Sequence, residues 1–318
     1  MTLRKLGVSL ALLIALGGAF AAFVAYRASS REAALIADRP ARGQFITVNG
    51  AKVHYITAGS GPDLILIHGA SGNALDLTGP LMAQLSQSYR VTAFDRPGLG
   101  WSDPIPDDTL KGQALHLAAA AGQLGVTSPI LVGQSYGGSV TLAWGLYAPL
   151  KPRALVLISA PSLPWPGTLD IWYRLTASRI GSTLIIPLAT AFVPESYIDA
   201  AIVGVFAPSP VPPGYGDTIE VDLTLRRSTL RANAGQVNAL RPQIVAMEPD
   251  YPQLTLPIEM LHGTADTIVP LKIHSEPFAA QMPNAHLVVI DGAGHMPHYS
   301  HTALVIDAIA RAALRSAP

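Results

Sequence analysis

The chain has 318 residues, in which 21 Lys or Arg balance 21 Asp or Glu, and charged residues make up only 13%. This balance leaves no basic field that would attract nucleic acid, so we expect no nucleic-acid partner. Without cysteine, the chain cannot form disulfides, bind zinc through cysteine or use a thiol nucleophile. The length allows a large core, arranged after the N-terminal segment as one domain with an insertion or as two domains.

The N-terminal segment carries a long apolar run, residues 6–26, that contains no charged residue. As a helix it spans about 30 Å, enough to cross a bilayer core. A cleaved signal peptide is the alternative, because residues 19–21 (Ala-Phe-Ala) resemble a cleavage site. The run continues beyond that point, which favours an uncleaved membrane anchor through residues 6–26.

The orientation of this anchor is weakly determined, because basic residues lie on both sides of it. Arg4, Lys5 and the amino terminus favour a cytoplasmic start. We therefore expect the rest of the chain to be periplasmic or extracellular, or secreted if the segment is cleaved. Residues 27–43 follow as a linker rich in Ala and Arg.

A β-hairpin and then alternating strands and helices are predicted from residue 44 onward. Residues 44–48 and 51–57 flank Asn49-Gly50, the dipeptide typical of a tight hairpin turn. The alternation predicts a largely parallel sheet covered by helices on both faces. The predicted strands are 63–67, 90–94, 129–132 and 154–158, and the predicted helices are 74–86, 109–124 and 136–148.

This alternation stops after residue 161. Residues 162–252 contain no buried-strand run and many prolines and aromatic residues, which predicts a mostly helical insertion over the sheet. Strands at 257–261 and 285–290 and a helix at 302–314 end the chain. The predicted organisation is therefore a membrane segment with linker (1–43), a core (44–161 and 253–318) and a cap (162–252).

The most informative motif is the pentapeptide Gly-Gln-Ser-Tyr-Gly at residues 133–137. It joins a predicted buried strand to a predicted helix, where a sharp turn can expose the hydroxyl of Ser135. Glycines flank such a serine because side chains there would collide with the neighbouring strand and helix. Ser135 is therefore the candidate nucleophile, and a glycine-rich turn without chemistry is the alternative.

A serine hydroxyl is a weak nucleophile at neutral pH, so it needs a base and an acid that orients the base. The best-placed base is His295, which follows the last strand and the turn Gly-Ala-Gly at 292–294. We rank His298 and His301 lower, because both begin the last helix.

The orienting acid should follow the neighbouring strand, and Asp266 does so. Asp291 also ends a strand, but it is too close along the chain to reach around His295. A turn-capping aspartate is the alternative for Asp266. The order Ser135, Asp266, His295 is that expected of a nucleophile turn of this kind.

Two backbone N–H groups must meet the negative oxygen that forms when a serine attacks a carbonyl. One comes from Tyr136, at a helix N-terminus where N–H groups are free. The other comes from the loop 68–73, with Ala70 as first candidate and Ser71 as second. His68 is expected to organise this loop and not to act as a base.

Together these residues resemble the α/β-hydrolase superfamily, in its group with a cap, over about residues 44 to 315. The resemblance is carried by His68-Gly69, residues 95–102, residues 133–137, Asp266 and Gly294-His295. It implies an α/β fold with a mostly parallel eight-stranded sheet, helices on both faces and a helical cap inserted after strand 6. It implies no metal and no organic cofactor, and a structural role for residues 95–98.

By the same resemblance, Ser135 is the nucleophile, His295 the base and then the acid, and Asp266 the orienting acid. Haloalkane dehalogenases and epoxide hydrolases of the group have aspartate at the nucleophile position, so serine argues against both. The expected activity is hydrolysis of a small or apolar carboxylic ester, with a small-molecule ester-like partner. The alternatives are an acyltransferase or perhydrolase, a C–C bond hydrolase, and a non-catalytic binding protein on the same fold.

The cap is expected to shape the substrate pocket. Its apolar composition suggests an apolar acyl or alcohol group, and its clearest cations are Arg226, Arg227 and Arg231. We take Trp165 and Met296 as candidate substrate contacts. The alternative is that the cap residues only pack on the core. The sequence leaves the oligomeric state open.

Overall fold

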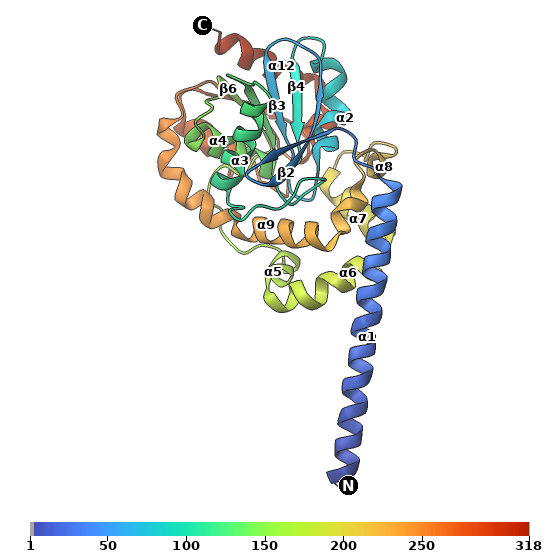
Figure 1. The fold of residues 1–318 in the computed structure, drawn as a ribbon. Helices are drawn as coiled ribbons and strands as arrows, with labels where there is room; N and C mark the ends of the chain where they lie inside the picture. The colour runs from blue at the N-terminus through green and yellow to red at the C-terminus, as the bar shows by residue number, and fades with distance from the viewer. Residues whose placement is uncertain (1–2, 318) are drawn as a thin grey trace.

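The computed structural model describes residues 3–317, and Figure 1 shows a twisted sheet wrapped by helices with one long helix, α1, projecting from it. The sheet has eight strands in the order β1-β2-β4-β3-β5-β6-β7-β8. β2 is antiparallel to β1 and β4, and all pairs from β4 to β8 are parallel. The predicted fold class is confirmed. The strands are β1 (Gln44–Val48), β2 (Ala51–Ala58), β3 (Asp63–Ile67), β4 (Arg90–Phe94), β5 (Ile130–Gln134), β6 (Ala154–Ile158), β7 (Ile258–Gly263) and β8 (Ala285–Ile290).

The hairpin between β1 and β2 turns at Asn49 (φ 50°) and Gly50 (φ 84°). Two consecutive positive φ angles match the right-handed twist of the flanking strands, and Asn-Gly adopts them at low cost. The turn sets the register, in which Val48 pairs with Ala51 and Gln44 with Tyr55.

Two hydrophobic layers cover the sheet. On one face, α2 (Ala74–Leu85) and α12 (Thr302–Arg315) pack on alternate strand residues such as Leu64 and Val156. On the other, α3 (Leu110–Gln123), α4 (Tyr136–Tyr147) and α10 (Ser275–Gln281) pack on the intervening residues, such as Ile65 and Leu155. Strands buried on both faces are continuous apolar runs, and this is the pattern that predicts them.

The chain between β6 and β7 forms a helical layer beyond the carboxyl ends of the strands (Figure 1). Its long helix α9 joins it to the core, where Gln236 and Asn233 bind Arg96 and the backbone of Ser71. The elements are α5 (Ile171–Ala177), a π-helical turn (Gly181–Ile185), α6 (Ile186–Phe192), α7 (Glu195–Phe206), α8 (Tyr215–Thr218), a 3-10 turn (Val221–Leu225), α9 (Arg227–Met247) and a second 3-10 turn (Glu248–Gln253). The short helix α11 (Pro297–Ser300) follows β8.

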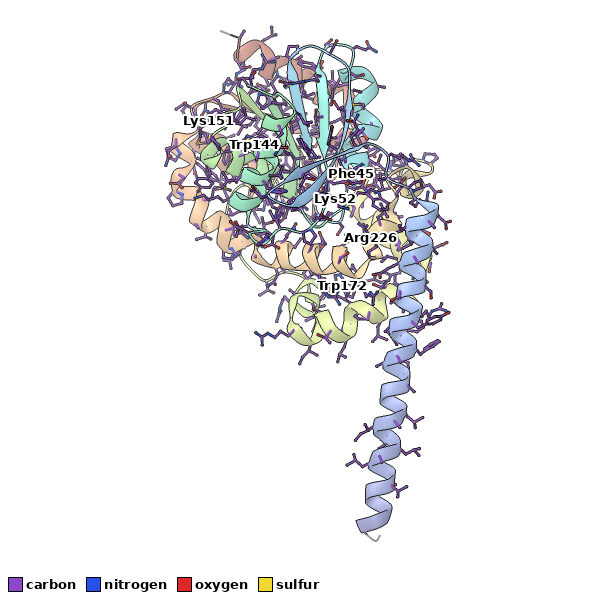
Figure 2. All side chains as sticks on the ribbon, viewed as in Figure 1. Phe45, Lys52, Trp144, Lys151, Trp172 and Arg226 are labelled. Carbon is purple, nitrogen blue, oxygen red and sulfur yellow. The ribbon has the colours of Figure 1, made fainter. Side chains whose placement is uncertain are left out.

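The N-terminal helix α1 runs from Leu3 to Asp38, so the expected linker is helical over most of its length. This part of α1 is rich in alanine, which favours a helix, and it docks on the cap. Arg27 and Arg31 donate to the carbonyls of Ala191 and Val193 at 3.0 and 2.7 Å. Glu32 forms an ion pair with Arg227 at 2.6 Å. These contacts hold the last turns of α1 against the protein, while residues 7–22 stand clear of it (Figure 1 and Figure 2).

Within residues 3–317, α1 is the one continuous helix that is long and apolar enough to cross a membrane. Residues 171–177 and 181–192 meet the same criterion as a pair, but they are bent by 92° at their break. Such a bend does not suit a single straight span.

Candidate active site

Ser135 lies at the turn between β5 and α4 with φ 50° and ψ −125°. Non-glycine residues rarely adopt a positive φ, and they do so where the surroundings enforce it. Here the Ser135 N–H donates to the carbonyl of Ile158 in β6, and the Ser135 carbonyl accepts from Gly138 N–H, both at 2.8 Å. The strained turn is thus held at both ends by backbone hydrogen bonds.

The two glycines of the pentapeptide are required by space. A Cβ at Gly137 would lie 2.1 Å from the carbonyl oxygen of Ile67 in β3. A Cβ at Gly133 would lie 2.3 Å from the hydroxyl of Thr141 in α4. Both distances are well inside van der Waals contact, so only glycine lets α4 begin this close to the sheet.

His295 and Asp266 meet beyond the ends of β8 and β7. His295 Nδ1 lies 2.8 Å from Asp266 Oδ2, and both side chains are buried. The other oxygen of Asp266, Oδ1, accepts the N–H groups of Ile268 and Val269 at 2.9 Å each. The carboxylate is therefore fixed by the backbone on one side and available to the histidine on the other.

A second histidine, His262 at the end of β7, also reaches this carboxylate. Its Nε2 lies 3.2 Å from Asp266 Oδ2 and 2.6 Å from the carbonyl of Val269, and its Nδ1 lies 2.6 Å from the hydroxyl of Ser275. Burial raises the pKa of Asp266, but the hydrogen bonds from His262 and His295 outweigh it and hold that pKa well below its usual range. Sequence reasoning missed His262, because a histidine inside a strand has no pattern of its own.

The turn before His295 is shaped by close packing. Gly292 has φ 69°, which favours glycine. A Cβ at Gly294 would lie 2.1 Å from the carbonyl oxygen of Ala207, at the end of α7. The cap backbone thus packs closely against the loop that carries His295.

The loop after β3 lies beside Ser135. A Cβ at Gly69 would lie 3.1 Å from the Cβ of Ser135, so the loop backbone passes the serine closely. The N–H of Ser71, the second oxyanion candidate, donates to Asn233 Oδ1 of α9 at 2.8 Å, so it already has an acceptor. This leaves the first candidate, Ala70, which lines the same cavity as Ser135. Tyr136 is the first residue of α4, so its N–H has no acceptor within the helix.

His68 and Arg96 hold this loop in place. Arg96 N–H donates to His68 Nε2 at 2.9 Å, so His68 Nδ1–H donates to the carbonyl of Gly69, 2.8 Å away. The Arg96 guanidinium also binds the carbonyls of His68 and Gly69, at 3.0 Å each. Burial, and then the charge of Arg96, lower the pKa of His68 to about 4, so this imidazole is neutral. The contacts are those of a loop organiser.

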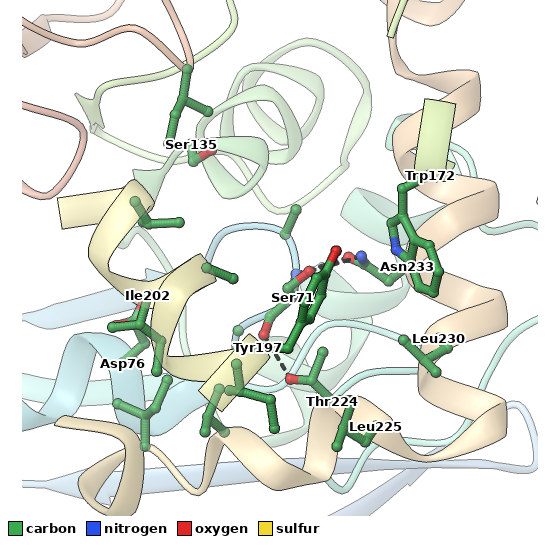
Figure 3. A pocket seen from close by; sticks show the side chains of 18 of the residues that line it. Ser71, Asp76, Ser135, Trp172, Tyr197, Ile202, Thr224, Leu225, Leu230 and Asn233 are labelled. Atoms are coloured by element: carbon green, nitrogen blue, oxygen red, sulfur yellow. Dashed lines mark hydrogen bonds between the residues drawn. The ribbon is translucent and has the colours of Figure 1, made fainter. Parts of the chain in front are cut away.

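A cavity of about 760 Å³ lies between the core and the cap and contains Ser135 and His295 in its lining (Figure 3). Cap residues such as Trp172, Ile202 and Leu230 form most of its wall. Apolar walls with few polar groups are typical of small-molecule sites. The cavity is thus suited to an apolar group held against Ser135.

The polar groups of the cavity lie mostly away from Ser135. Ser71 accepts from the hydroxyl of Thr224 at 2.8 Å through its carbonyl oxygen. The carboxylate of Asp76 accepts from the hydroxyl of Tyr215 at 2.9 Å. Sequence reasoning did not single out Asp76, because an acid in the first turn of a helix is common. His298 is fully buried, with Nε2 3.8 Å from Asp76 Oδ2, and does not reach Asp266.

The two expected substrate contacts, Met296 and Trp165, differ in their position relative to the cavity. Met296 lines the cavity next to His295. Trp165 does not line this cavity, since its ring packs on the core and meets the ring of His274 edge-on at 5.7 Å. Trp165 lies only a few residues beyond β6, and this stretch of chain is held on the core before the cap helices begin.

The three cap arginines do not line the cavity either. Arg226 donates to the carbonyl of Gly100, and Arg227 binds Glu32 of α1. Arg231 donates to the carbonyl of Ser182 at 3.3 Å. Arg226 thus connects the cap to the core, Arg227 connects it to α1, and Arg231 connects two parts of the cap. Residues 3–317 contain no cluster of three or more His, Cys, Asp or Glu side chains placed to hold a metal ion.

A serine on a strained strand-to-helix turn under a helical cap is the arrangement of α/β-fold hydrolases. Residues 64–308 match the family model described as the Alpha/beta hydrolase family, and the chain belongs to this family.

Similar proteins include an uncharacterized protein of Mycobacterium tuberculosis, 29% identical over 276 residues, which covers 84% of this chain and 80% of that protein. A pimeloyl-[acyl-carrier protein] methyl ester esterase of Aliivibrio salmonicida is 25% identical over 266 residues, with 79% and 91% covered. The solved structure of an esterase from Exiguobacterium antarcticum superimposes with a TM-score of 0.69 at 20% identity, with 85% and 99% covered. These findings support a hydrolase of the α/β fold.

Proposed function

We propose that this protein is a serine hydrolase that cleaves a small or apolar carboxylic ester through a covalent acyl-enzyme. Ser135 is the nucleophile, His295 the general base and then acid, and Asp266 the orienting acid. The observation that carries the proposal is the joint placement of Ser135 and His295 in one cavity, with His295 Nδ1 hydrogen-bonded to Asp266 at 2.8 Å. The esterase named among the relatives supports an ester substrate.

In the first step of the proposed reaction, each of these side chains has one role. Asp266 accepts a hydrogen bond from His295 Nδ1–H, which leaves Nε2 unprotonated and able to take the Ser135 hydroxyl proton. The Ser135 oxygen attacks the ester carbonyl, and the N–H groups of Ala70 and Tyr136 stabilise the oxyanion.

The collapse of the tetrahedral intermediate breaks the bond to the alcohol, which leaves with the proton from His295. A water molecule then gives its proton to His295 and attacks the acyl-enzyme. The second tetrahedral intermediate releases the carboxylic acid, and His295 returns the proton to the Ser135 oxygen. Neither step requires a metal or an organic cofactor.

We also propose that α1 anchors the protein in a membrane through residues 6–26, with the hydrolase domain on the periplasmic or extracellular side. The uncharged run, its helical structure and its separation from the folded domain support an anchor. Secretion after cleavage is the alternative. Fractionation of cells that express the full chain, followed by measurement of the mature N-terminus by mass spectrometry, distinguishes the two.

The direct test of the proposed function is Ser135→Ala with p-nitrophenyl butyrate as substrate. We expect turnover to fall by at least about 10³-fold, because the nucleophile is lost. Ser88→Ala is the matched control, since Ser88 is exposed in the turn before β4. This turn lies at the opposite ends of the parallel strands from Ser135, so the control should keep full activity.

A Ser135→Ala variant that keeps most of its turnover would overturn the assignment. Product analysis with a competing alcohol or peroxide separates hydrolysis from acyl transfer and perhydrolysis. Wild-type protein that folds but turns over no ester of varied acyl length, while cleaving a ring-fission diketone, would favour the C–C hydrolase.

A further inference from the structure

The cap carries a surface of exposed apolar side chains. Ile180, Leu184 and Ile171 are 72%, 59% and 58% exposed. Contiguous exposed apolar surface is uncommon on soluble monomers and marks a site of interaction. We call this set the apolar cap surface; it comprises Ile171, Leu175, Ile180, Leu184 and Leu188.

The apolar cap surface lies beside the proposed membrane anchor. In Figure 1, α5 and α6 occupy the end of the domain from which α1 projects toward the N-terminus. The ring of Phe192 at the end of α6 is 6.3 Å from that of Phe23, and Ala191 is buried together with Val24 and Ala28 of α1. The cap is therefore attached to α1 at residues 23–28.

This attachment sets the height of the cap relative to a bilayer. The uncharged run of α1 ends at Tyr26, and Arg27 follows it. If residues 6–26 fill the hydrocarbon core, Phe23 and Arg27 lie at its boundary. α6 touches α1 at that level, so the end of the domain formed by α5 and α6 lies next to the headgroup region.

The charges of the segment fit such a position. From residue 171 to residue 194 there is no acidic residue. Arg174 and Arg179 are present and exposed on the same segment. Apolar side chains accompanied by arginine are characteristic of helices that lie in the membrane interface and bind anionic headgroups. The 92° bend between residues 171–177 and 181–192 also suits a segment that lies on a bilayer better than one that crosses it.

The same helices form the wall of the cavity that contains Ser135. Trp172 of α5, Ala189 of α6 and Tyr197 of α7 all line it. Tyr197 is also 62% exposed, so it marks a place where the cavity wall reaches the surface. Tyr197 lies on α7, which begins three residues after the end of α6 and its apolar side chains.

From this arrangement we infer that the apolar cap surface rests in the headgroup region of the membrane that α1 crosses, and that the cavity takes its ester substrate from the lipid phase. The inference rests on the proposed esterase function and on the proposed anchor. It names the substrate class as an ester with an apolar chain that partitions into a bilayer.

The first test measures where the surface lies, and it does not depend on activity. The chain has no cysteine, so a single cysteine can carry a fluorescent nitrobenzoxadiazole label. Ile180→Cys and Leu184→Cys probe the surface in full-length protein reconstituted into phosphatidylcholine and phosphatidylglycerol vesicles. Leu314→Cys on α12 is the matched control, because it is 78% exposed and lies near the opposite end of the molecule (Figure 1).

We expect labels at 180 and 184 to shift to shorter emission wavelength and to be quenched by doxyl-labelled lipid, and the label at 314 to be quenched by aqueous iodide only. Labels at 180 and 184 that behave as the label at 314 would overturn the inference. Protection from both quenchers that depends on protein concentration would also overturn it, by showing that a second copy covers the surface.

The second test separates this inference from the proposed function. The double variant Ile180→Asp, Leu184→Asp should hydrolyse a long-chain ester in vesicles at least about tenfold more slowly, because buried apolar contact with lipid is lost. It should hydrolyse soluble p-nitrophenyl butyrate at the wild-type rate, and Leu314→Asp should change neither rate. Unchanged vesicle hydrolysis in the double variant contradicts the inference alone, whereas failure of wild-type protein on the soluble ester contradicts the proposed function.

Discussion

Replacing Asp266 by asparagine changes one carboxylate oxygen to an amide nitrogen where two histidines meet. Asp266 Oδ1 accepts the N–H groups of Ile268 and Val269, so the asparagine must keep its oxygen there. Its NH₂ group then faces His295 Nδ1, which now donates to Oδ2, and His262 Nε2, which lies 3.2 Å from Oδ2. A hydrogen bond to this NH₂ group requires His295 Nδ1 to be an acceptor, so the imidazole proton moves to Nε2. The protonated Nε2 can no longer take the proton of the serine.

The expected loss is large. With the wrong tautomer, kcat should fall by about 10³–10⁴-fold, equivalent to about 4–5.5 kcal/mol of transition-state stabilisation. The fold should survive, because the backbone hydrogen bonds remain, with a stability loss of about 1–3 kcal/mol from the altered contacts to the histidines. The assay is kcat for p-nitrophenyl butyrate, together with a thermal unfolding curve.

Asp291→Asn is the matched control. Asp291 is exposed at the end of β8 and accepts the hydroxyl of Thr264 at 3.1 Å, without contact to His295. Its kcat should stay within about twofold of wild type, as for most surface substitutions. If a folded Asp266→Asn variant keeps more than about a tenth of wild-type kcat, the role assigned to the carboxylate is wrong.

Two further predictions concern stability. The pKa of buried His68 is about 4 in the folded state and near 6.5 in the unfolded state, so between these values the unfolded state binds more protons. The free energy of unfolding should therefore fall as pH drops from about 6.5 to 4, by up to about 3 kcal/mol from this residue. Urea unfolding at pH 7, 5.5 and 4.5 checks this, and a midpoint that does not fall contradicts it. Gly137→Ala should destabilise the protein by several kcal/mol, because its Cβ meets the Ile67 carbonyl, whereas Gly122→Ala in α3, where nothing lies within 4 Å, should be neutral or stabilise it by up to about 1 kcal/mol. Equal unfolding temperatures for the two glycine variants would contradict the packing account.

The fold could be predicted from the sequence because its signals are local and repeated. Apolar runs such as 63–67 and 154–158 are strands buried on both faces, and Asn49-Gly50 sets the hairpin. The pentapeptide at 133–137 is equally informative, because its two glycines meet backbone and side-chain atoms of neighbouring elements.

The cap and its contacts could not be predicted in the same way. Residues 27–38 lie against the cap because Arg27, Arg31 and Glu32 bind residues more than 150 positions away in the chain. Trp165 is a residue type that often lines a substrate pocket, but its position on the core depends on where the chain leaves β6. Such properties arise from the tertiary arrangement and leave no periodic pattern in the sequence.

The reactivity of Ser135 is measured most directly by mass spectrometry of the protein after reaction with a fluorophosphonate. We expect one covalent adduct per chain, located on the peptide that contains Ser135. We also expect no adduct in Ser135→Ala and slow adduct formation in Asp266→Asn. Folded wild-type protein that forms no adduct, or that forms it on another serine, would contradict the assignment of Ser135 as an activated nucleophile.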